Sequence, residues 1–545
     1  MLSALGESAM VETRTMRRLV SVLNWSALSI LLSIIYPVVF ALSNNWFTIG
    51  SQKILWLIGS AVGIAAAIAA SAWFLDALIV RVILRTAPDL EHRWKALIAP
   101  AIVALLCAGI LAALFWGTLQ AVFGSDALTV AAAGSAAVAI VWVFVSGRVR
   151  YFNGILALLT ALSTVGWLFS YADHKLLAPM ATKFLAEKET FESARLVEKP
   201  NIYVFIFDAY GSRDAYQRVF NFDNSAHYDA LGNRGFKVLH TFSNYYATWP
   251  TTLSLFLGNH HYYRISTGMA DSKIGRLIMA GLARNPVLET LRNNGYRVQQ
   301  IHGIDYFLNE RGVLDFVYPE EPLYSALRIF DSPLLNGIFG AHGVRAGPRS
   351  VKEEMKVLWD RMRGPPADTG ESWFTFSHVS LPNHAPIGAD WLQLKDFEQQ
   401  FRDATVTANK LMLEVIDAIK AKDPGAIVVI IGDHGAWRYR RIWGHSEDPN
   451  VGIREAGVDP QIVSLDLFGI MIAIDSGGRC DDLVYAGMTP VNIMRVLFAC
   501  LAKDRSLLAT KAADISLFAN VRHGLWITAR DGESVPTWEP FDKPD

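Results

Sequence analysis

Long apolar runs dominate the first third of the chain. Five stretches are long and apolar enough to cross a bilayer as helices, and they cover residues 20–42, 54–75, 97–119, 127–146 and 152–172. The first stretch is too long and uninterrupted for a cleaved signal peptide, so it is expected to be retained. The pattern therefore predicts a five-helix transmembrane domain over residues 1–172.

The basic residues in the short loops between these stretches predict the orientation of the helices. Nine of them fall on one side and one on the other: Arg14, Arg17, Arg18, Arg81, Arg85, Arg93, Lys95, Arg148 and Arg150 against Lys53. Because cytoplasmic loops carry an excess of Lys and Arg, the N-terminus is predicted to be cytoplasmic. With an odd number of spans, the remainder of the chain is expected outside the cytoplasm, in a periplasm or at the cell surface.

Beyond the fifth stretch the pattern changes twice. Residues 173–198 mix Lys and acidic residues with Leu and Phe, which is typical of an interfacial connector or, equally, of a solvated linker helix. From there short β-rich runs alternate with helical ones, as in a sheet layered by helices. The prediction is a multi-pass α-helical membrane domain followed by an α/β/α sandwich over residues 199–520, with a C-terminal tail over 521–545.

Two elements of the predicted sandwich are especially clear. Residues 202–207 are almost continuously apolar, as expected for a parallel strand that is buried on both faces. Residues 396–421 carry apolar side chains at helical spacing and lead through Pro424 and Gly425 into the apolar run 426–432. Both apolar runs are predicted to be central strands.

Composition supports the division of the 545-residue chain. Apolar residues make up 52%, which fits a membrane part joined to a soluble part, and the net charge of -1 argues against nucleic-acid binding. A transporter is disfavoured because the membrane part has one clear acidic residue, Asp76, near a helix end. Cys107 lies in a predicted membrane helix, and the sequence leaves open whether Cys480 and Cys500 pair.

The segment 243–258 predicts a helix that begins at a hydroxyl residue. Thr248 is placed at the N-cap, Pro250 falls in the first turn where a missing amide hydrogen is tolerated, and Gly258 closes the helix. The positive end of the helix dipole favours an anion at that place. Thr248 is therefore either an ordinary N-cap or a nucleophile toward a phosphate or sulfate ester, if a neighbouring group lowers its pKa.

Metal-ligand residues follow both predicted central strands. Asp208 comes directly after 202–207, and Asp433 and His434 come directly after 426–432. Ligands in open α/β sheets gather at the carboxyl ends of strands, and an adjacent Asp and His can reach one metal ion, with Gly435 allowing a tight turn. A lone Asp at a strand end is usually a turn residue, so the combination with Thr248 carries the prediction of a metal-activated threonine.

The order of these residues resembles the alkaline phosphatase superfamily. The segment from Thr248 to Gly258 is similar to the nucleophile segments of sulfatases and nucleotide pyrophosphatase/phosphodiesterases. Five spans followed by an extracytoplasmic domain resemble the lipoteichoic acid synthases and the phosphoethanolamine transferases that modify lipid A. The resemblance implies that Asp208, Thr248, Asp433 and His434 bind one divalent ion, with Thr248 also the nucleophile. Zn, Mn and Mg all suit this ligand set.

Three departures from these families limit the assignment. Asp208 stands where the lipoteichoic acid synthases and phosphoethanolamine transferases have Glu. The second-metal pattern of the phosphodiesterases is not visible near residues 382–390, so one tightly held ion is predicted and a second, weaker ion stays open. The multiple disulfides of the lipid A transferases are missing, which weakens that assignment.

Further polar residues are assigned by the same resemblance. His302 and Arg311 reproduce the spacing of a His and an Arg that contact glycerol phosphate in lipoteichoic acid synthases, so they are predicted substrate contacts. His384 resembles a Pro-His-x-Pro segment and is predicted to protonate a leaving group or bind substrate. His445 is predicted to do the same or to hold the second ion. Packing or surface positions are expected for His260, His261 and His378.

The predicted reaction has two steps. Thr248 attacks a phosphodiester to give a phospho-threonine, with helix amides and Arg311 holding the developing charge while His384 or His445 protonates the leaving alcohol. A phosphoglycerol or phosphoethanolamine group then passes from a membrane phospholipid donor to an envelope glycan or lipid acceptor. If water is the acceptor, the same site is a sulfatase-like hydrolase, although Thr248 replaces the oxidised Cys usual in sulfatases. A receptor without activity is disfavoured by the intact residue set.

Overall fold

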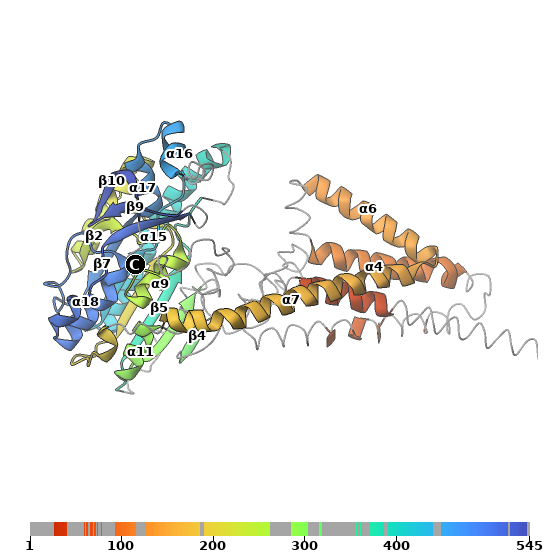
Figure 1. The fold of residues 1–545 in the computed structure, drawn as a ribbon, viewed down its shortest axis with the longest axis horizontal. Coiled ribbons are helices and arrows are strands. Elements are labelled where there is room, and N and C mark those ends of the chain that lie inside the picture. Colours follow the sequence, from red (N-terminus) through yellow and green to blue (C-terminus); the bar gives the residue numbers. More distant parts are fainter. Residues whose placement is uncertain are drawn as a thin grey trace, which may run out of the picture. The chain divides into compact units, whose positions relative to one another are not determined.

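The chain forms two compact units that divide at Asp173. The computed structural model describes residues 27–40, 93–115, 126–185, 190–261, 285–302, 315–318, 370–385, 391–439, 448–520 and 524–541, together with isolated helical positions between 59 and 78 and at 356 and 360. Figure 1 labels many of the elements of both units.

The first unit is helical. Its described helices are Ala27–Phe40, α4 (Ala99–Leu114), which follows a short π-helical turn at Trp94–Ile98, α6 (Asp126–Val145) and the start of α7 (Val149–Leu185). Ile30, Ala104, Cys107 and Phe144 form part of a small buried cluster, whereas apolar residues such as Phe169 are exposed. Exposed apolar side chains of this kind mark surfaces that contact another protein or a membrane.

The described part of this unit contains one helix that is a candidate membrane span, so the five-helix prediction is not confirmed. Val149–Phe169 is long and apolar enough to cross a membrane, while Ala27–Phe40, Ala99–Ala112 and Val130–Val145 are apolar but shorter. The stretch predicted over 54–75 lies mostly outside the described residues. The helix α7 continues to Leu185 and covers the first half of the predicted connector.

The second unit is built on a seven-stranded mixed sheet with the order β2-β7-β6-β1-β5-β3-β4. The strands are β1 (Ile202–Phe207), β2 (Lys237–Phe242), β3 (Arg297–His302), β4 (Phe316–Tyr318), β5 (Trp373–Val379), β6 (Ile427–Gly432) and β7 (Gly469–Asp475). β7 runs antiparallel to both of its neighbours, and the other pairs are parallel. Both predicted central strands are confirmed as β1 and β6.

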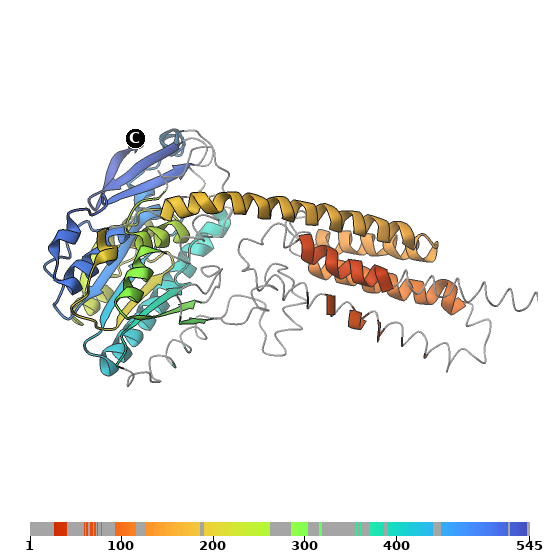
Figure 2. The same cartoon turned by 60° about the horizontal axis from the view of Figure 1, so that its bottom comes forward.

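Helices cover both faces of this sheet. They are α8 (Ser225–Gly232), α9 (Thr248–Leu257), α11 (Pro286–Asn293), α15 (Trp391–Lys422), α16 (Pro449–Glu455), α17 (Pro460–Phe468) and α18 (Pro490–Ala502). Side chains alternate along β1: Val204 and Ile206 share a core with α9, α11 and α18, whereas Phe205 and Phe207 share a core with α15 and α17. The predicted α/β/α sandwich is therefore confirmed, and Figure 2 shows its layers from a second side.

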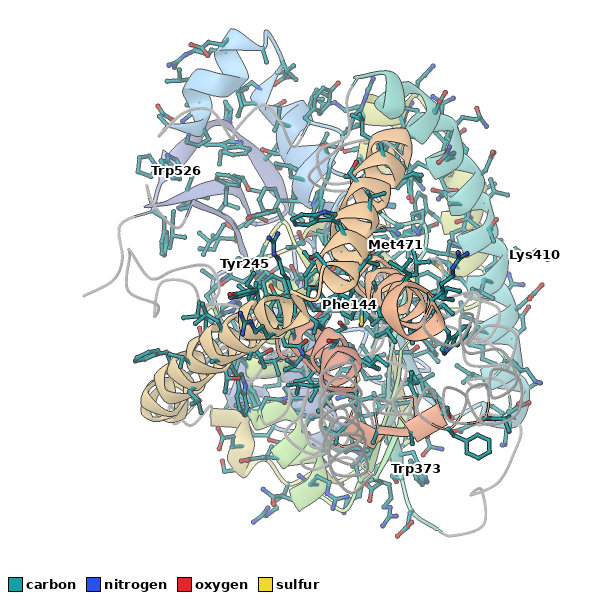
Figure 3. All side chains as sticks on the ribbon, turned by 90° about the vertical axis from the view of Figure 1, so that its right-hand side faces the viewer. Phe144, Tyr245, Trp373, Lys410, Met471 and Trp526 are labelled. Atoms are coloured by element: carbon teal, nitrogen blue, oxygen red, sulfur yellow. A yellow bond between two sulfur atoms is a disulfide. The ribbon has the colours of Figure 1, made fainter. Side chains whose placement is uncertain are left out.

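The long helix α15 confirms the helical period predicted for 396–421. Phe401, Ala408 and Val415 on that period are buried in the core, whereas Lys410 lies on the outer side of the helix, where Figure 3 labels it. Figure 3 also labels Met471 of β7, which is buried in the same core as these three residues. The apolar stripe thus seats α15 on the sheet.

The predicted C-terminal tail is wrong for residues 524–540. They form β9 (Gly524–Arg530) and β10 (Glu533–Pro540), which join β8 (Ile515–Asn520) in a three-stranded antiparallel sheet. Trp538 is buried and its indole nitrogen donates a 2.8 Å hydrogen bond to the hydroxyl of Ser464 in α17. The segment belongs to the fold because its aromatic side chains pack on the second unit.

The structure also answers the question about the cysteines. Cys480 and Cys500 form a disulfide that joins the loop after β7 to α18, and Cys107 is a buried free thiol. Disulfides persist in oxidising compartments.

Candidate metal centre

Three neighbouring parallel strands end at the same level of the sheet. Phe207, the last residue of β1, pairs with Gly432 of β6 on one side and with Val379 of β5 on the other. The next residues, Asp208 and Asp433, therefore emerge side by side at one edge. A hydrogen bond from backbone to side chain reinforces this, since the amide of Ala209 donates to Asp433 Oδ1 at 2.9 Å.

Asp208, Asp433 and His434 form a compact group of possible metal ligands. All three are buried, and one donor atom from each lies within 4.8 Å of the others. His434 Nε2 is 3.6 Å from Asp208 Oδ1 and 3.5 Å from Asp433 Oδ2. Within the part of the chain that the structure describes, this is the group of His, Cys, Asp and Glu side chains that could hold a metal.

The tautomer of the neutral His434 ring follows from its own hydrogen bond. Its Nδ1 lies 2.7 Å from the carbonyl oxygen of Gly435, and a carbonyl can only accept, so Nδ1 carries the hydrogen. In the neutral ring, Nε2 then presents a lone pair to the two carboxylates. This is the arrangement typical of a metal-ligating histidine, whose other ring nitrogen donates to a backbone carbonyl.

The pKa values of the two carboxyl groups move in opposite directions, for different reasons. Burial, and then the charge of Asp433, raise the pKa of Asp208 well above its usual range. The pKa of Asp433 is lowered: burial opposes this, but His434, His378 and the amide of Ala209 favour the ionised form. Asp208 Oδ1 and Asp433 Oδ2 are buried without a hydrogen-bond partner among the described residues. A cation between them would satisfy both oxygens and let both carboxylates ionise.

Two glycines let the loop between Gly432 and Gly435 approach backbone on both sides. A Cβ added to Gly432 would lie 2.0 Å from the carbonyl oxygen of Tyr210, and one added to Gly435 would lie 1.9 Å from that of Asp466. The chain bends at His434, next to Gly435, but the φ of Gly435 is not in the left-handed region, so this turn does not require glycine for its backbone conformation. Glycine is required there by close packing.

Thr248 of α9 adds a hydroxyl to this group of possible metal ligands. Its Oγ1 lies 3.1 Å from His434 Nε2, although the two residues are 186 positions apart. The predicted helix start is wrong by one residue: Ala247 is the N-cap, with extended backbone, and Thr248 is the first helical residue of α9. The Thr248 hydroxyl therefore does not cap the helix and is directed to the metal-ligand group. Gly258 closes α9 in the left-handed conformation, as predicted.

The loop after β5 brings His384 to the same edge. The amide of Asn383 donates to the carbonyl of Asp208 at 3.0 Å, and the amide of Ala385 donates to that of Ala436 at 2.8 Å. The ring of His384 is centred 5.6 Å from that of His434. Its Nδ1 donates to the carbonyl of Ala385, which makes Nε2 the nitrogen that can exchange a proton.

The remaining predicted site residues, His302, Arg311 and His445, cannot be compared with the structure. His302 ends β3, but its side chain lies outside the described part of the chain, as do Arg311 and His445. His260 and His261 are buried beside Tyr245, in agreement with the packing role expected for them.

The sequence interpretation missed His378. This buried residue of β5 was expected to be a packing residue, but its Nε2 lies 3.7 Å from Asp433 Oδ2. Its position one residue before the end of a strand next to β1 is the signal that could have indicated a role behind a metal ligand.

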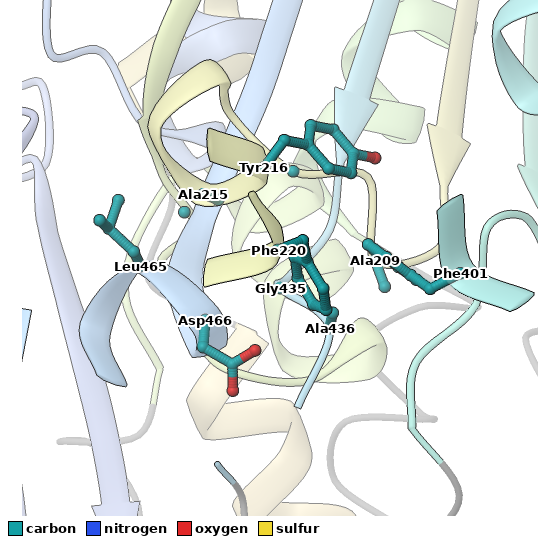
Figure 4. Close-up of a pocket in the computed structure, with 11 residues that line it drawn as sticks. Ala209, Ala215, Tyr216, Phe220, Phe401, Gly435, Ala436, Leu465 and Asp466 are labelled. Atoms are coloured by element: carbon teal, nitrogen blue, oxygen red, sulfur yellow. The ribbon is translucent and has the colours of Figure 1, made fainter. Parts of the chain in front are cut away.

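Figure 4 shows a small pocket behind these loops, lined among others by Ala209, Phe220, Gly435 and Asp466. None of the four possible metal-site residues lines it. It is therefore a gap in the packing under the site. Burial raises the pKa of Asp466 to about 7, although the amides of Tyr439 and Arg438 donate to its carboxylate.

No family model matches the chain, and no curated protein matches its sequence. Among solved structures, the C-terminal periplasmic domain of EcEptC from Escherichia coli is 11% identical, with 59% of this chain and 90% of that domain covered and a TM-score of 0.38. This domain has also been solved in complex with Zn. The corresponding domain of phosphoethanolamine transferase EptC from Campylobacter jejuni is 10% identical over 57% of this chain and 91% of its own, with a TM-score of 0.35.

A protein of the alkaline phosphatase superfamily from Vibrio parahaemolyticus is 12% identical, with 64% of this chain and 83% of its own covered and a TM-score of 0.35. The structures found are thus of the kinds that the sequence resemblance named. TM-scores below 0.5 carry no weight for function, which must be inferred from the site itself.

Proposed function

We propose that this protein is a metal-dependent enzyme that transfers a phosphoryl-type group from an ester through a covalent bond to Thr248. The observation that carries the proposal is a convergence of groups at one buried point. These are the Thr248 hydroxyl, the His434 lone pair and two carboxylate oxygens that have no hydrogen-bond partner within the described part of the chain. Asp208, Asp433, His434 and Thr248 would hold one divalent ion, for which Zn, Mn and Mg are suitable. When bound, the ion lowers the pKa of a hydroxyl and neutralises ester oxygens.

The chain's own residues then have separate tasks. Thr248 Oγ1 gives its proton to solvent and forms the new bond to the phosphorus, and the bond from phosphorus to the leaving alcohol breaks. In the second step the hydroxyl of the acceptor bonds to the phosphorus, and the bond from phosphorus to Thr248 Oγ1 breaks. The first turn of α9 directs the positive end of its dipole at this reacting centre. His384, held against His434 by the loop after β5, is suited to give the leaving alcohol its proton through Nε2.

The substrates we favour are a membrane phospholipid donor and an envelope glycan or lipid acceptor. An enzyme whose chain includes an apolar span such as Val149–Phe169 works close to a lipid pool, which supports a phosphoglycerol or phosphoethanolamine headgroup as the transferred unit. The Cys480–Cys500 disulfide supports an oxidising location for the second unit, in the periplasm or outside the cell. The loop charges support a multi-pass anchor in the bacterial inner membrane. Contacts from His302, Arg311 and His445 belong to this proposal.

Hydrolysis is the second candidate. The same residues would cleave a phosphodiester or sulfate ester if water, not an alcohol, accepts the group from Thr248. The buried Thr248 hydroxyl and its metal ligands serve both reactions, so the acceptor decides between them.

The test is the intact mass of the full-length protein in detergent after incubation with a divalent metal and mixed phospholipids. Thr248→Ala is the negative variant, and Thr248→Ser is the matched variant that keeps the hydroxyl. We expect an added mass on the wild type and a smaller amount on Thr248→Ser, with none on Thr248→Ala. The size of the adduct distinguishes phosphoglycerol from phosphoethanolamine.

A chromogenic phosphodiester and a sulfate ester complete the experiment. Cleavage that falls more than about 1000-fold in Thr248→Ala, without any lipid adduct, would replace the transferase with the hydrolase. An equal rate in wild type and Thr248→Ala would refute both.

A further inference from the structure

Trp437 has an unusual conformation beside the metal centre. It follows His434 by three positions, and its side chain is 8% exposed. Its φ is +64°, a left-handed backbone conformation that is uncommon for a bulky residue. Such a conformation persists only where surrounding contacts hold it, and it often marks a functional position.

The contacts that hold Trp437 join three segments of the site. Its indole nitrogen donates a 2.6 Å hydrogen bond to the carbonyl of Tyr246, two residues before Thr248. Its ring lies nearly parallel to that of His434, at 17° with the centroids 4.8 Å apart. The ring of His384 lies against it at 3.8 Å and 30°. One side chain therefore touches the metal loop, the loop after β5 and the approach to α9.

We propose that Trp437 is a positioning residue that sets the ring planes of His434 and His384 and ties the metal loop to the nucleophile segment. This inference rests on the proposed function, because it assumes that the site binds a metal ion. The hydrogen bond from His434 Nδ1 to the carbonyl of Gly435 still lets the imidazole tilt about that bond. A flat ring stacked on the imidazole removes this freedom, so Nε2 keeps its direction. Residues that orient metal ligands typically change metal affinity 10–100-fold when they are replaced.

A second tryptophan of the same unit gives a matched control. Trp538 is 1% exposed, and its indole nitrogen also donates to one oxygen, the hydroxyl of Ser464. Its ring contacts Phe518 and Phe468, with ring centroids 5.2 and 6.5 Å apart. Within the described residues it contacts neither His384 nor His434. Replacing either tryptophan removes similar packing, but only Trp437 should affect the histidines.

The experiment uses the full-length protein in detergent with the variants Trp437→Leu, Trp437→Phe and Trp538→Leu. Zinc affinity is measured by calorimetry. The reaction of His384 and His434 with diethyl pyrocarbonate, without metal, is measured by peptide mass spectrometry. Kinetics with a chromogenic phosphodiester separate kcat from KM.

For Trp437→Leu we expect zinc affinity to fall by about 10-fold or more and both histidines to be modified faster. Trp437→Phe keeps a stacked ring but loses the hydrogen bond to Tyr246, so both quantities should lie between those of the wild type and those of Trp437→Leu. Trp538→Leu should lower the melting temperature and leave zinc affinity and histidine modification unchanged. If the diester is cleaved, Trp437→Leu should lower kcat more than it changes KM.

Two outcomes would overturn the inference. One is wild-type zinc affinity together with wild-type histidine modification in Trp437→Leu. The other is an equal change of both quantities in Trp538→Leu, which would make the effect one of general packing. A wild type that binds zinc but cleaves no ester through Thr248 would refute the proposed function alone. If the wild type binds no zinc, histidine modification decides about Trp437.

Discussion

Replacing Gly435 with Ala should disable the metal centre through a steric clash with backbone. The added Cβ would lie 1.9 Å from the carbonyl oxygen of Asp466 and 2.6 Å from its carbonyl carbon, whereas ordinary contact begins at 3.4 Å. Backbone atoms cannot rotate away, so the loop must shift by roughly 1.5 Å to restore ordinary contact. Overpacking of this kind destabilises a protein by about 1–3 kcal/mol.

The same clash should also weaken metal binding, by an amount comparable to its effect on stability. His434 precedes Gly435 directly, and its Nδ1 is held by the Gly435 carbonyl, so a loop shift moves the imidazole. Metal–ligand distances tolerate deviations of only about ±0.2 Å. A shift on the order of 1 Å should therefore lower metal affinity by about 10-fold to 100-fold. Activity toward a chromogenic ester should fall by a similar factor at a metal concentration near the wild-type Kd.

The assay compares zinc calorimetry with urea unfolding of the metal-free, full-length protein. Gly232→Ala is the control, because a Cβ at the end of α8 meets no atom within 4 Å. We expect that variant to be neutral or up to about 1 kcal/mol more stable, with unchanged zinc affinity. Wild-type zinc affinity in Gly435→Ala would refute the packing explanation of this glycine.

Three further predictions concern stability. The pKa of Asp466 rises from 3.8 to about 7 on folding, so its protonated form is favoured in the folded state. Stability of the metal-free protein should therefore fall as pH rises from about 4 to 7, and Asp466→Asn should reduce that fall in urea unfolding at pH 5 and pH 8. Replacing Cys480 and Cys500 with Ser removes a cross-link between positions separated by 20 residues, which should lower the unfolding free energy by about 3 kcal/mol. Gly258→Ala should destabilise by about 2 kcal/mol, because φ is +64° and the new Cβ would lie 2.5 Å from the ring of Phe191.

A specific result would contradict each of these three predictions. An unchanged pH dependence in Asp466→Asn would mean that another group titrates, with Asp208 the first to test, since its pKa is also raised. A reducing agent should lower the melting temperature of the wild type but not that of the double serine variant, and an equal effect on both would contradict the disulfide. A melting temperature of Gly258→Ala equal to that of the wild type would show that α9 closes in another way.

Much of the candidate site could be predicted because the residues that indicate it lie close together in the sequence. The apolar runs of β1 and β6 are continuous, and Asp208 and Asp433 each follow one of them directly. The helical period of α15 is visible in the sequence for the same reason, since one face of it is buried. Thr248 was identified through its neighbours Pro250 and Gly258, which mark a helix start and a helix end.

The contacts around these residues could not be predicted in the same way. A hydrophobic period indicates which face is buried but does not indicate what covers it. The neighbours of β1 in the sheet are β5 and β6, which lie far along the chain, so the contact of His378 with Asp433 depends on sheet order. The stacking of Trp437 on His384 is equally non-local.

The sequence by itself determined the two central strands, the long helix and the candidate metal-site residues Asp208, Thr248, Asp433 and His434, because each follows from chemistry at a single position or from a short repeat. The tertiary structure decided why Gly435 must be small, that Cys480 and Cys500 pair, and that residues 524–540 pack on the fold. These properties depend on distances between segments that are remote in sequence, and such distances exist only once the sheet has formed.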